Sequence, residues 1–224
     1  MNPVVIGDCT LYLGDCLEIL TSPVSIERML GRIDAVITDP PYGVSMNGNA
    51  GRRAKNTDQI TGDGVLPDVS WMAAYPSIIW GGNNFCNQLP RSTGWLVWNK
   101  YHPSESQHSQ AELAWTNTVR TIRLHAEAYH GFMRAIDGWH HPTQKPPALM
   151  GWCLEFLPDA ETILDPFMGS GTTGVACVNL SRKFIGIEIE PKYFDIACRR
   201  IEEAYRQPRL FAEPQVKPKQ EILL

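Results

Sequence analysis

The stretch TILDPFMGSGTTG (residues 162–174) contains the transition on which the predicted fold depends. Its first half is a short apolar run, as expected for a strand that is buried on both faces of a parallel sheet. Its second half places Gly169, Gly171 and Gly174 in G-x-G-x-x-G spacing, which lets the chain turn tightly and lets backbone approach a ligand. The stretch therefore predicts a strand, a glycine loop and the start of a helix.

Other apolar runs extend this pattern along the chain. The clearest are DAVIT (34–38) and FIGIEI (184–189), and further strands are predicted at 10–15, 77–82 and 94–100. Helical spacing lies between and after them, most clearly in EPKYFDIACRRIEEAYR (190–206), where Pro191 suits a first helical turn. Alternating strands and helices predict an α/β fold with a doubly wound, mostly parallel sheet.

Length and composition favour one domain. A chain of 224 residues with 43% hydrophobic content can bury one sizeable core, which we place in residues 1–206, with an extended tail at 207–224. No window approaches the roughly 18 uninterrupted apolar residues of a membrane span, and no secretory signal is evident, so we expect a cytoplasmic protein. The six cysteines are scattered without a C-x-x-C pair, and His140 and His141 lack a second ligand pair, so no metal site is predicted.

The charge distribution is uneven. The net charge of -4 argues against a protein that coats nucleic acid. Residues 45–60, however, hold three cations against one acid, and residues 115–150 hold four cations against two acids. These segments are either basic contact surfaces or ordinary solvated loops, and the charges alone do not decide between the two.

The run at 34–38 ends in the turn DPPY (39–42). This turn supplies a carboxylate at Asp39, an outward carbonyl at Pro40 and an aromatic ring at Tyr42. Two acceptors and a stacking ring suit a planar base that carries an exocyclic amine. Since the loops that follow parallel strands converge at one edge of the sheet, this turn and the glycine loop should open onto one crevice.

The glycine loop alone leaves several interpretations open. Glu188 lies where a carboxylate at the end of the next strand would hold ribose hydroxyls, which suits a nucleoside cofactor. A nicotinamide dinucleotide is one candidate, and a tight turn without any ligand is another. A phosphate loop of the ATPase type is disfavoured because no lysine follows the last glycine.

Taken together, these motifs resemble the S-adenosylmethionine-dependent amino methyltransferases of DNA. DPPY (39–42) is similar to the family's catalytic motif and DPFMGSGTT (165–173) to its cofactor loop. HPTQKP (141–146), GIEIEPKYFDIA (186–197) and LYLGDCLEIL (11–20) are similar to further family segments. The catalytic motif comes first and the cofactor loop last, which resembles the beta arrangement.

The resemblance implies a Rossmann-like, seven-stranded sheet, S-adenosyl-L-methionine as cofactor and DNA as partner. It implies that the exocyclic amine of a flipped base donates hydrogen bonds to Asp39 and the Pro40 carbonyl, so that its lone pair can attack the sulfonium methyl. The residues assigned to catalysis are Asp39, Pro40, Pro41 and Tyr42. Those assigned to the cofactor are Asp15, Cys16, Asp39, Thr143, Lys145, Asp165, Phe167, Gly169, Ser170, Gly171, Thr172, Thr173 and Glu188.

The resemblance also bears on the substrate. Aspartate at the first position of DPPY favours adenine N6 over cytosine N4. The chain has little length for target recognition beyond a mobile loop around 45–70 and a small region within about 101–140, which suggests an orphan or phage-borne enzyme. Phosphate contacts are expected from Arg52, Arg53 and Lys55. A homodimer is compatible with a small enzyme of this type.

Tryptophans are candidates for contacting a flipped base or the gap that it leaves. Trp80, Trp98 and Trp139 are the residues considered, with ordinary core or surface positions as the alternative.

Overall fold

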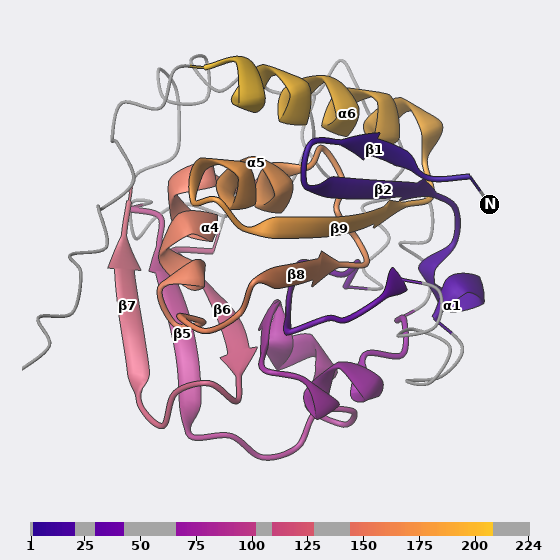
Figure 1. Ribbon diagram of the computed structural model, residues 1–224. Coiled ribbons are helices and arrows are strands. Elements are labelled where there is room, and N and C mark those ends of the chain that lie inside the picture. Colours follow the sequence, from indigo (N-terminus) through magenta and orange to yellow (C-terminus); the bar gives the residue numbers. More distant parts are fainter. Residues whose placement is uncertain (1, 21–29, 43–65, 102–108, 128–143, 208–224) are drawn as a thin grey trace, which may run out of the picture.

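The computed structural model describes residues 2–20, 30–42, 66–101, 109–127 and 144–207. Within these residues a single mixed sheet has the strand order β1-β2-β9-β8-β3-β4-β6-β5-β7 (Figure 1). Five neighbouring pairs are parallel and three are antiparallel, so the predicted mostly parallel α/β sheet is confirmed.

Each of the six apolar runs predicted as strands forms a strand, whereas the strands at 4–6, 111–116 and 122–126 were not predicted. The strands are β1 (Val4–Ile6), β2 (Cys9–Leu13), β3 (Ala35–Thr38), β4 (Ser77–Trp80), β5 (Gly94–Asn99), β6 (Ala111–Thr116), β7 (Ile122–Ala126), β8 (Thr162–Asp165) and β9 (Lys183–Glu188). The α-helices are α1 (Cys16–Ile19), α4 (Pro147–Leu154), α5 (Thr172–Asn179) and α6 (Pro191–Arg206), and two 3₁₀ helices are η1 (Ser70–Ala74) and η2 (Gly82–Phe85).

The expected number of strands was wrong, because the described sheet has nine strands rather than seven. β1 and β7 form its two edges, where β1 pairs antiparallel with β2 and β7 pairs parallel with β5. β1 is only three residues long and β7 is exposed along most of its length, so neither contains a buried apolar run. The described part of the segment 101–140, in which a recognition region is expected, contributes β6 and β7 to the sheet.

Two apolar cores cover the two faces of the sheet. Alternate strand residues point to opposite sides, so Ile37 packs in the core beneath α4, α5 and α6. Its neighbour Val36 packs in the other core, with residues of α1, η1 and η2. Figure 1 shows α4, α5 and α6 together on one side of the sheet. Among the described residues, no helix combines the length and apolar character that crossing a bilayer requires.

β3 and β8 form the topological switch point of the sheet, from which the connections continue in opposite directions. The two strands are parallel neighbours. β4 lies beside β3 on one side, whereas β9 lies beside β8 on the other. In open α/β sheets, ligands bind beyond the carboxyl ends of the strands at such a point. Both sequence motifs leave the sheet there.

Candidate active site

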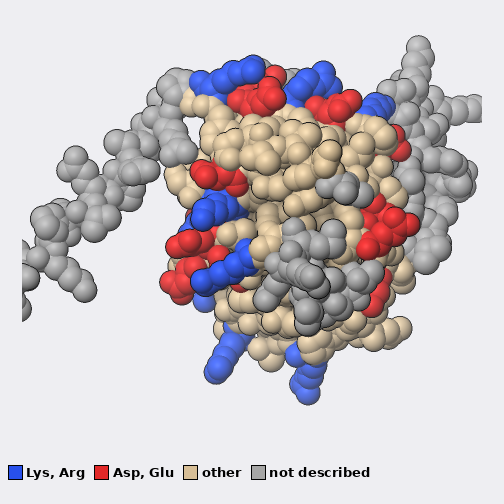
Figure 2. Space-filling model, turned by 45° about the vertical axis from the view of Figure 1, so that its right-hand side comes forward, with Lys and Arg blue, Asp and Glu red and all other residues tan. Residues whose placement is uncertain are grey.

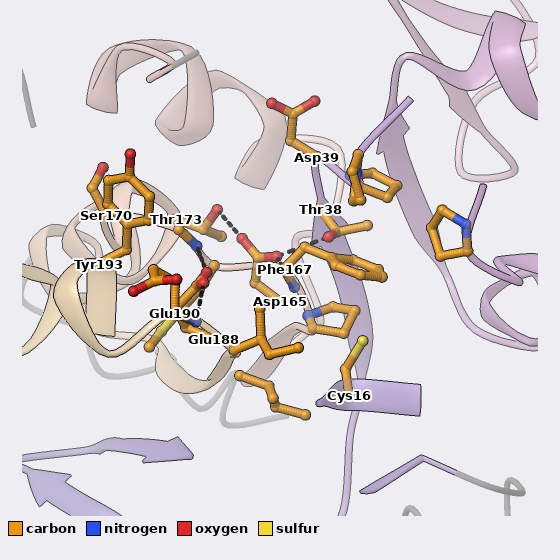
Figure 3. A pocket seen from close by; sticks show the side chains of 18 of the residues that line it. Cys16, Thr38, Asp39, Asp165, Phe167, Ser170, Thr173, Glu188, Glu190 and Tyr193 are labelled. Carbon is orange, nitrogen blue, oxygen red and sulfur yellow. Dashed lines mark hydrogen bonds between the residues drawn. The ribbon is translucent and has the colours of Figure 1, made fainter. Parts of the chain in front are cut away.

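A cavity of about 510 Å³ opens at the carboxyl ends of β3 and β8. Its walls come from the turn after β3 and from the loop after β8, with further residues from the β2–α1 and β9–α6 connections. Figure 3 shows Asp39 above Phe167, with the group of Glu188, Glu190 and Tyr193 to the left of both. The predicted shared crevice is therefore present.

The glycine loop needs glycine at its turn into α5. Gly171 is the N-cap residue of α5 and has a left-handed backbone with φ 78°. A Cβ at this position would lie 2.8 Å from the Cβ of Ala197 in α6. A larger residue would therefore strain the backbone and collide with α6. Gly171 faces α6 rather than the cavity wall, so its effect on a ligand is indirect.

Asp165 ties the two motif loops together. Its carboxylate accepts hydrogen bonds from the Thr38 hydroxyl at 2.8 Å and the Thr173 hydroxyl at 2.7 Å. It also accepts one from the backbone N–H of Phe167 at 3.1 Å. Figure 3 shows the two threonines on either side of this carboxylate. Burial raises the pKa of Asp165 to about 6, despite these donors.

Two further carboxylates stand at strand ends around the cavity. Glu188, the last residue of β9, accepts backbone N–H groups from Gly169 at 2.9 Å and Glu190 at 2.8 Å, and burial raises its pKa. Asp15 caps α1 by accepting the N–H of Leu17 at 2.8 Å. A carboxylate has about four acceptor positions, so both residues retain capacity for ligand hydroxyls.

The lining is strongly acidic. Among the described lining residues, six are acidic and Lys145 is the one basic side chain; the acids are Asp15, Asp39, Asp68, Asp165, Glu188 and Glu190. Such a wall favours a ligand with cationic groups and repels a pyrophosphate. A ligand that carries a sulfonium and an ammonium group fits this group of carboxylates. A nicotinamide dinucleotide fits it poorly.

The DPPY turn presents an organised acceptor. The Tyr42 hydroxyl donates to Asp39 Oδ1 at 2.5 Å, and burial together with the Asp39 charge raises the pKa of Tyr42 well above its usual value. The Tyr42 ring lies directly against Gly81 after β4, where a Cβ would come within 2.0 Å of it. The tyrosine is therefore fixed at both ends, by a hydrogen bond at the hydroxyl and by contact along the ring.

Lys145 also contacts Asp39, which the sequence does not predict. Its ammonium donates to Asp39 Oδ2, and it lies 3.2 Å from Glu112 Oε2 and 5.5 Å from the centre of the Trp80 ring. The Lys145 side chain is 6% exposed, but the Asp39 side chain keeps 25% exposure. Asp39 is thus ion-paired and still reaches the cavity.

Most of the predicted site residues line this cavity. They are Asp15, Cys16, Asp39, Pro40, Pro41, Tyr42, Lys145, Asp165, Phe167, Gly169, Ser170, Thr172, Thr173 and Glu188. Thr143, Trp139 and the predicted phosphate contacts Arg52, Arg53 and Lys55 lie outside the described residues. Trp80 and Trp98 are buried in the core beneath α4 to α6, so of the two alternatives they take the core position.

Motif reasoning missed Arg200, a buried residue of α6. Its guanidinium donates to the Ser170 carbonyl at 2.7 Å, to the Ser170 hydroxyl at 2.9 Å and to the Thr172 hydroxyl at 3.1 Å. It therefore holds the glycine loop from behind. A buried-face position in an amphipathic helix was the signal that could have identified it, because an arginine there requires polar partners.

Thr38, Gln144 and Tyr193 also line the cavity without having been singled out. Each lies within or beside a quoted motif, so proximity in sequence was the available signal.

Comparison with known proteins agrees with this geometry. A family model described as DNA methylase, of the N6/N4 methyltransferase type, matches residues 86–199. The chain is 29% identical to the Type II methyltransferase M2.DpnII of Streptococcus pneumoniae, over 62% of this chain and 51% of that protein. It is also 29% identical to the Type II methyltransferase M.HinfI of Haemophilus influenzae, over 89% of this chain and 52% of that protein. The chain thus spans about half the length of these curated relatives.

Two solved structures share the fold. The crystal structure of an M1.HpyAVI–SAM complex superposes with a TM-score of 0.54 and 25% identity, covering 86% of this chain and 98% of that chain. The cytosine-N4-specific PvuII DNA methyltransferase superposes with a TM-score of 0.55 and 15% identity, covering 88% of this chain and 91% of that chain.

Proposed function

The chain belongs to the N6/N4 DNA methylase family, and from that premise we propose that it transfers a methyl group from S-adenosylmethionine to the exocyclic amine of a DNA base. The observation that carries the proposal is the meeting of the DPPY turn and the glycine loop at one acidic cavity. The similar M1.HpyAVI structure is that of a complex with SAM, which supports the choice of cofactor.

The cofactor would lie against the glycine loop and the end of β9. Glu188 has acceptor capacity for ribose hydroxyls, Phe167 offers an apolar surface for the adenine ring, and the acidic wall favours the cationic groups of the ligand. When bound, the cofactor supplies an electrophilic methyl group on a sulfonium. Arg200 and Asp165 keep the loop in shape for it.

Asp39 and Pro40 would activate the amine of the substrate. Their acceptor oxygens take the two N–H bonds of the exocyclic amine, which favours a pyramidal nitrogen with an available lone pair. A carbon–nitrogen bond forms as the carbon–sulfur bond breaks, and the nitrogen then loses one proton, for which the Asp39 carboxylate is positioned as acceptor. The target base must leave the duplex, and Tyr42 offers a surface on which it stacks.

Adenine N6 is the proposed target because the motif begins with aspartate, which resembles the adenine enzymes. Cytosine N4 is the alternative. The structural likeness to the cytosine-N4-specific PvuII enzyme concerns the fold and favours neither base.

The proposed DNA contacts involve the cations Arg52, Arg53 and Lys55. On the face in Figure 2, the charged side chains of described residues gather mainly toward the margins, and uncharged residues fill much of the space between them. The visible described residues therefore form no continuous basic surface on this face. Phosphate contacts from the three cations would make DNA binding strongly dependent on salt. A homodimer and a cytoplasmic location remain predictions.

Asp39→Ala tests the proposal directly. The wild-type protein, given labelled S-adenosylmethionine and unmethylated DNA, should label the DNA, and the variant should not. S-adenosylhomocysteine should bind both proteins with similar affinity, because Asp39 acts on the amine of the base. Sequencing the product by a method that distinguishes methyladenine from methylcytosine identifies the base. Retained transfer by Asp39→Ala would refute the role of this carboxylate.

A further inference from the structure

Behind the DPPY turn lies a row of charged side chains, of which Lys100 and Glu112 belong to no quoted sequence motif. Glu112, on β6, has its Oε2 atom 3.2 Å from the Lys145 ammonium, and its Oε1 atom forms an ion pair with Lys100 at the end of β5. Lys145 in turn is paired with Asp39. Opposite charges therefore alternate from Lys100 through Glu112 and Lys145 to Asp39.

Lys145 needs both of its carboxylate partners. Its side chain is 6% exposed, and a buried ammonium without compensating charge is strongly destabilising. Burial lowers the pKa of Lys145, but Asp39 and then Glu112 outweigh this effect and raise it well above its usual value. Burial likewise opposes ionisation of Glu112, yet Lys145 and Lys100 hold the pKa of Glu112 at about 2. Both groups stay charged at neutral pH.

The geometry leaves the Lys145 ammonium little freedom. Asp39 and Glu112 take two sides of it, and the Trp80 ring, 5.5 Å away, faces it with π electrons. Asp39 is then fixed at both of its oxygens, by Lys145 at Oδ2 and by Tyr42 at Oδ1. Its remaining acceptor positions are the ones available to a ligand in the cavity.

We propose that Glu112 is a positioning residue for methyl transfer, which anchors Lys145 so that Lys145 fixes the Asp39 carboxylate toward the substrate amine. This inference rests on the proposed function. Glu112 does not line the cavity and contacts neither the cofactor nor the base in this scheme. It acts through Lys145, and Lys100 holds Glu112 from the opposite side.

The first test is Glu112→Gln, which keeps the shape of the side chain and removes its charge. We expect kcat to fall roughly ten- to hundredfold, since displacement of a reacting group by about 1 Å has an effect of this order. The Kd for S-adenosylhomocysteine, measured by calorimetry, should stay within about twofold of the wild-type value. Glu112→Asp, which restores the charge, should give a kcat between the two.

Glu127→Gln is the matched control. Glu127 follows β7 in the same part of the sheet and is paired with His125 at 3.0 Å rather than with Lys145. The same chemical change there should leave kcat unchanged. If Glu112→Gln unfolds, as judged by thermal melting, Glu112→Asp decides the question. A lower kcat with an unchanged Kd supports the inference, and a wild-type kcat overturns it.

A double-mutant cycle shows whether Glu112 acts through Lys145. Lys145→Met should lower kcat, and adding Glu112→Gln to it should cause little further loss, because the anchored group is already absent. The inference would be overturned if the two losses in kcat were additive. It would also be overturned if the Kd for S-adenosylhomocysteine rose by as large a factor as kcat fell. The wild-type protein separates this outcome from a failure of the proposed function, because that failure would leave wild-type protein without transfer to any unmethylated DNA.

Discussion

At the scale of single residues, Asp165 is a buried carboxylate with a structural role beside a second acid, Asp39, that reaches the cavity. It joins the end of β3 to the start of α5 through two threonine hydroxyls. Asp39 is only 25% exposed, yet it keeps an edge in the cavity. Asp165 and Asp39 belong to neighbouring loops, and their different hydrogen-bond partners give them different roles.

Asp165 makes stability depend on pH with a definite sign. Its pKa is raised from 3.8 to about 6 by burial. Between these values the unfolded chain has released a proton that the folded chain still holds, so raising the pH favours unfolding. The contribution is fully present below about pH 4 and is lost as the pH passes about 6, and it amounts to about 3 kcal/mol.

Urea denaturation of wild type and Asp165→Asn from pH 4 to 7 measures this effect. The variant lacks the titrating group, so the wild-type free energy of unfolding, minus that of the variant, should decrease as the pH rises. A difference that stays constant across this range would show that the Asp165 carboxyl does not titrate there.

Gly81 allows Tyr42 to take its place, and Gly81→Ala should displace the ring. Gly81 has φ 65° and Gly31 has φ 80°, so alanine at either position costs roughly 1 kcal/mol of backbone strain. An added Cβ meets Tyr42 at 2.0 Å in the first case and nothing within 4 Å in the second. We expect Gly81→Ala to lower kcat at least tenfold. Gly31→Ala should lower the stability of the protein and leave kcat unchanged. Equal kcat values for the two variants would contradict this explanation.

At the scale of elements, α6 supports the glycine loop as well as covering the sheet. Arg200 reaches from the buried face of α6 to Ser170 and Thr172, and Ala197 packs on Gly171. The helix and the loop should therefore respond together to changes in either one.

Arg200→Met should weaken cofactor binding. It removes three hydrogen bonds to the glycine loop and leaves the Ser170 carbonyl without this donor. A loss of about 1.4 kcal/mol raises a Kd tenfold, and we expect an effect of about this size for S-adenosylhomocysteine. Arg199→Met, on the exposed face of the same helix, is the control and should bind normally. An unchanged Kd for Arg200→Met would show that the loop holds its shape without this arginine.

The sequence predicted some elements far better than others, for a physical reason. β3, β4, β8 and β9 are buried on both faces, so their apolar runs stand out. β7 is mostly exposed and β1 is too short to show a pattern. Glu112 and Arg200 were missed because the partners that connect them to the site, Lys145 and Ser170, lie about 30 residues away along the chain, a distance at which local patterns carry no information.

At the scale of the whole molecule, the balance of charge around the cavity selects among nucleoside cofactors. Six acidic residues and one lysine line the described part of its wall. The glycine spacing alone left a nicotinamide dinucleotide open, and the assembled cavity disfavours its pyrophosphate. The six acids come from five separate segments of the chain, so this balance of charge exists only in the assembled fold.

Thermal melting with added ligand tests the selectivity. S-adenosylhomocysteine at about 100 times its Kd should stabilise the protein by about 2.7 kcal/mol and raise the melting temperature. NAD at the same concentration should leave it unchanged. A comparable rise with NAD would mean that the acidic wall does not discriminate against phosphate groups.

The fact that β3 and β8 are neighbours has a consequence for how the protein can evolve. The two halves of the site are joined laterally by backbone hydrogen bonds between strands, whereas more than a hundred residues of chain separate Asp39 from Asp165. A gene rearrangement that exchanged the order of the two halves could therefore preserve the pocket, provided that both strands still found the same neighbours. Natural selection would then preserve which strands are neighbours in the sheet. The order of those strands along the chain would be free to vary.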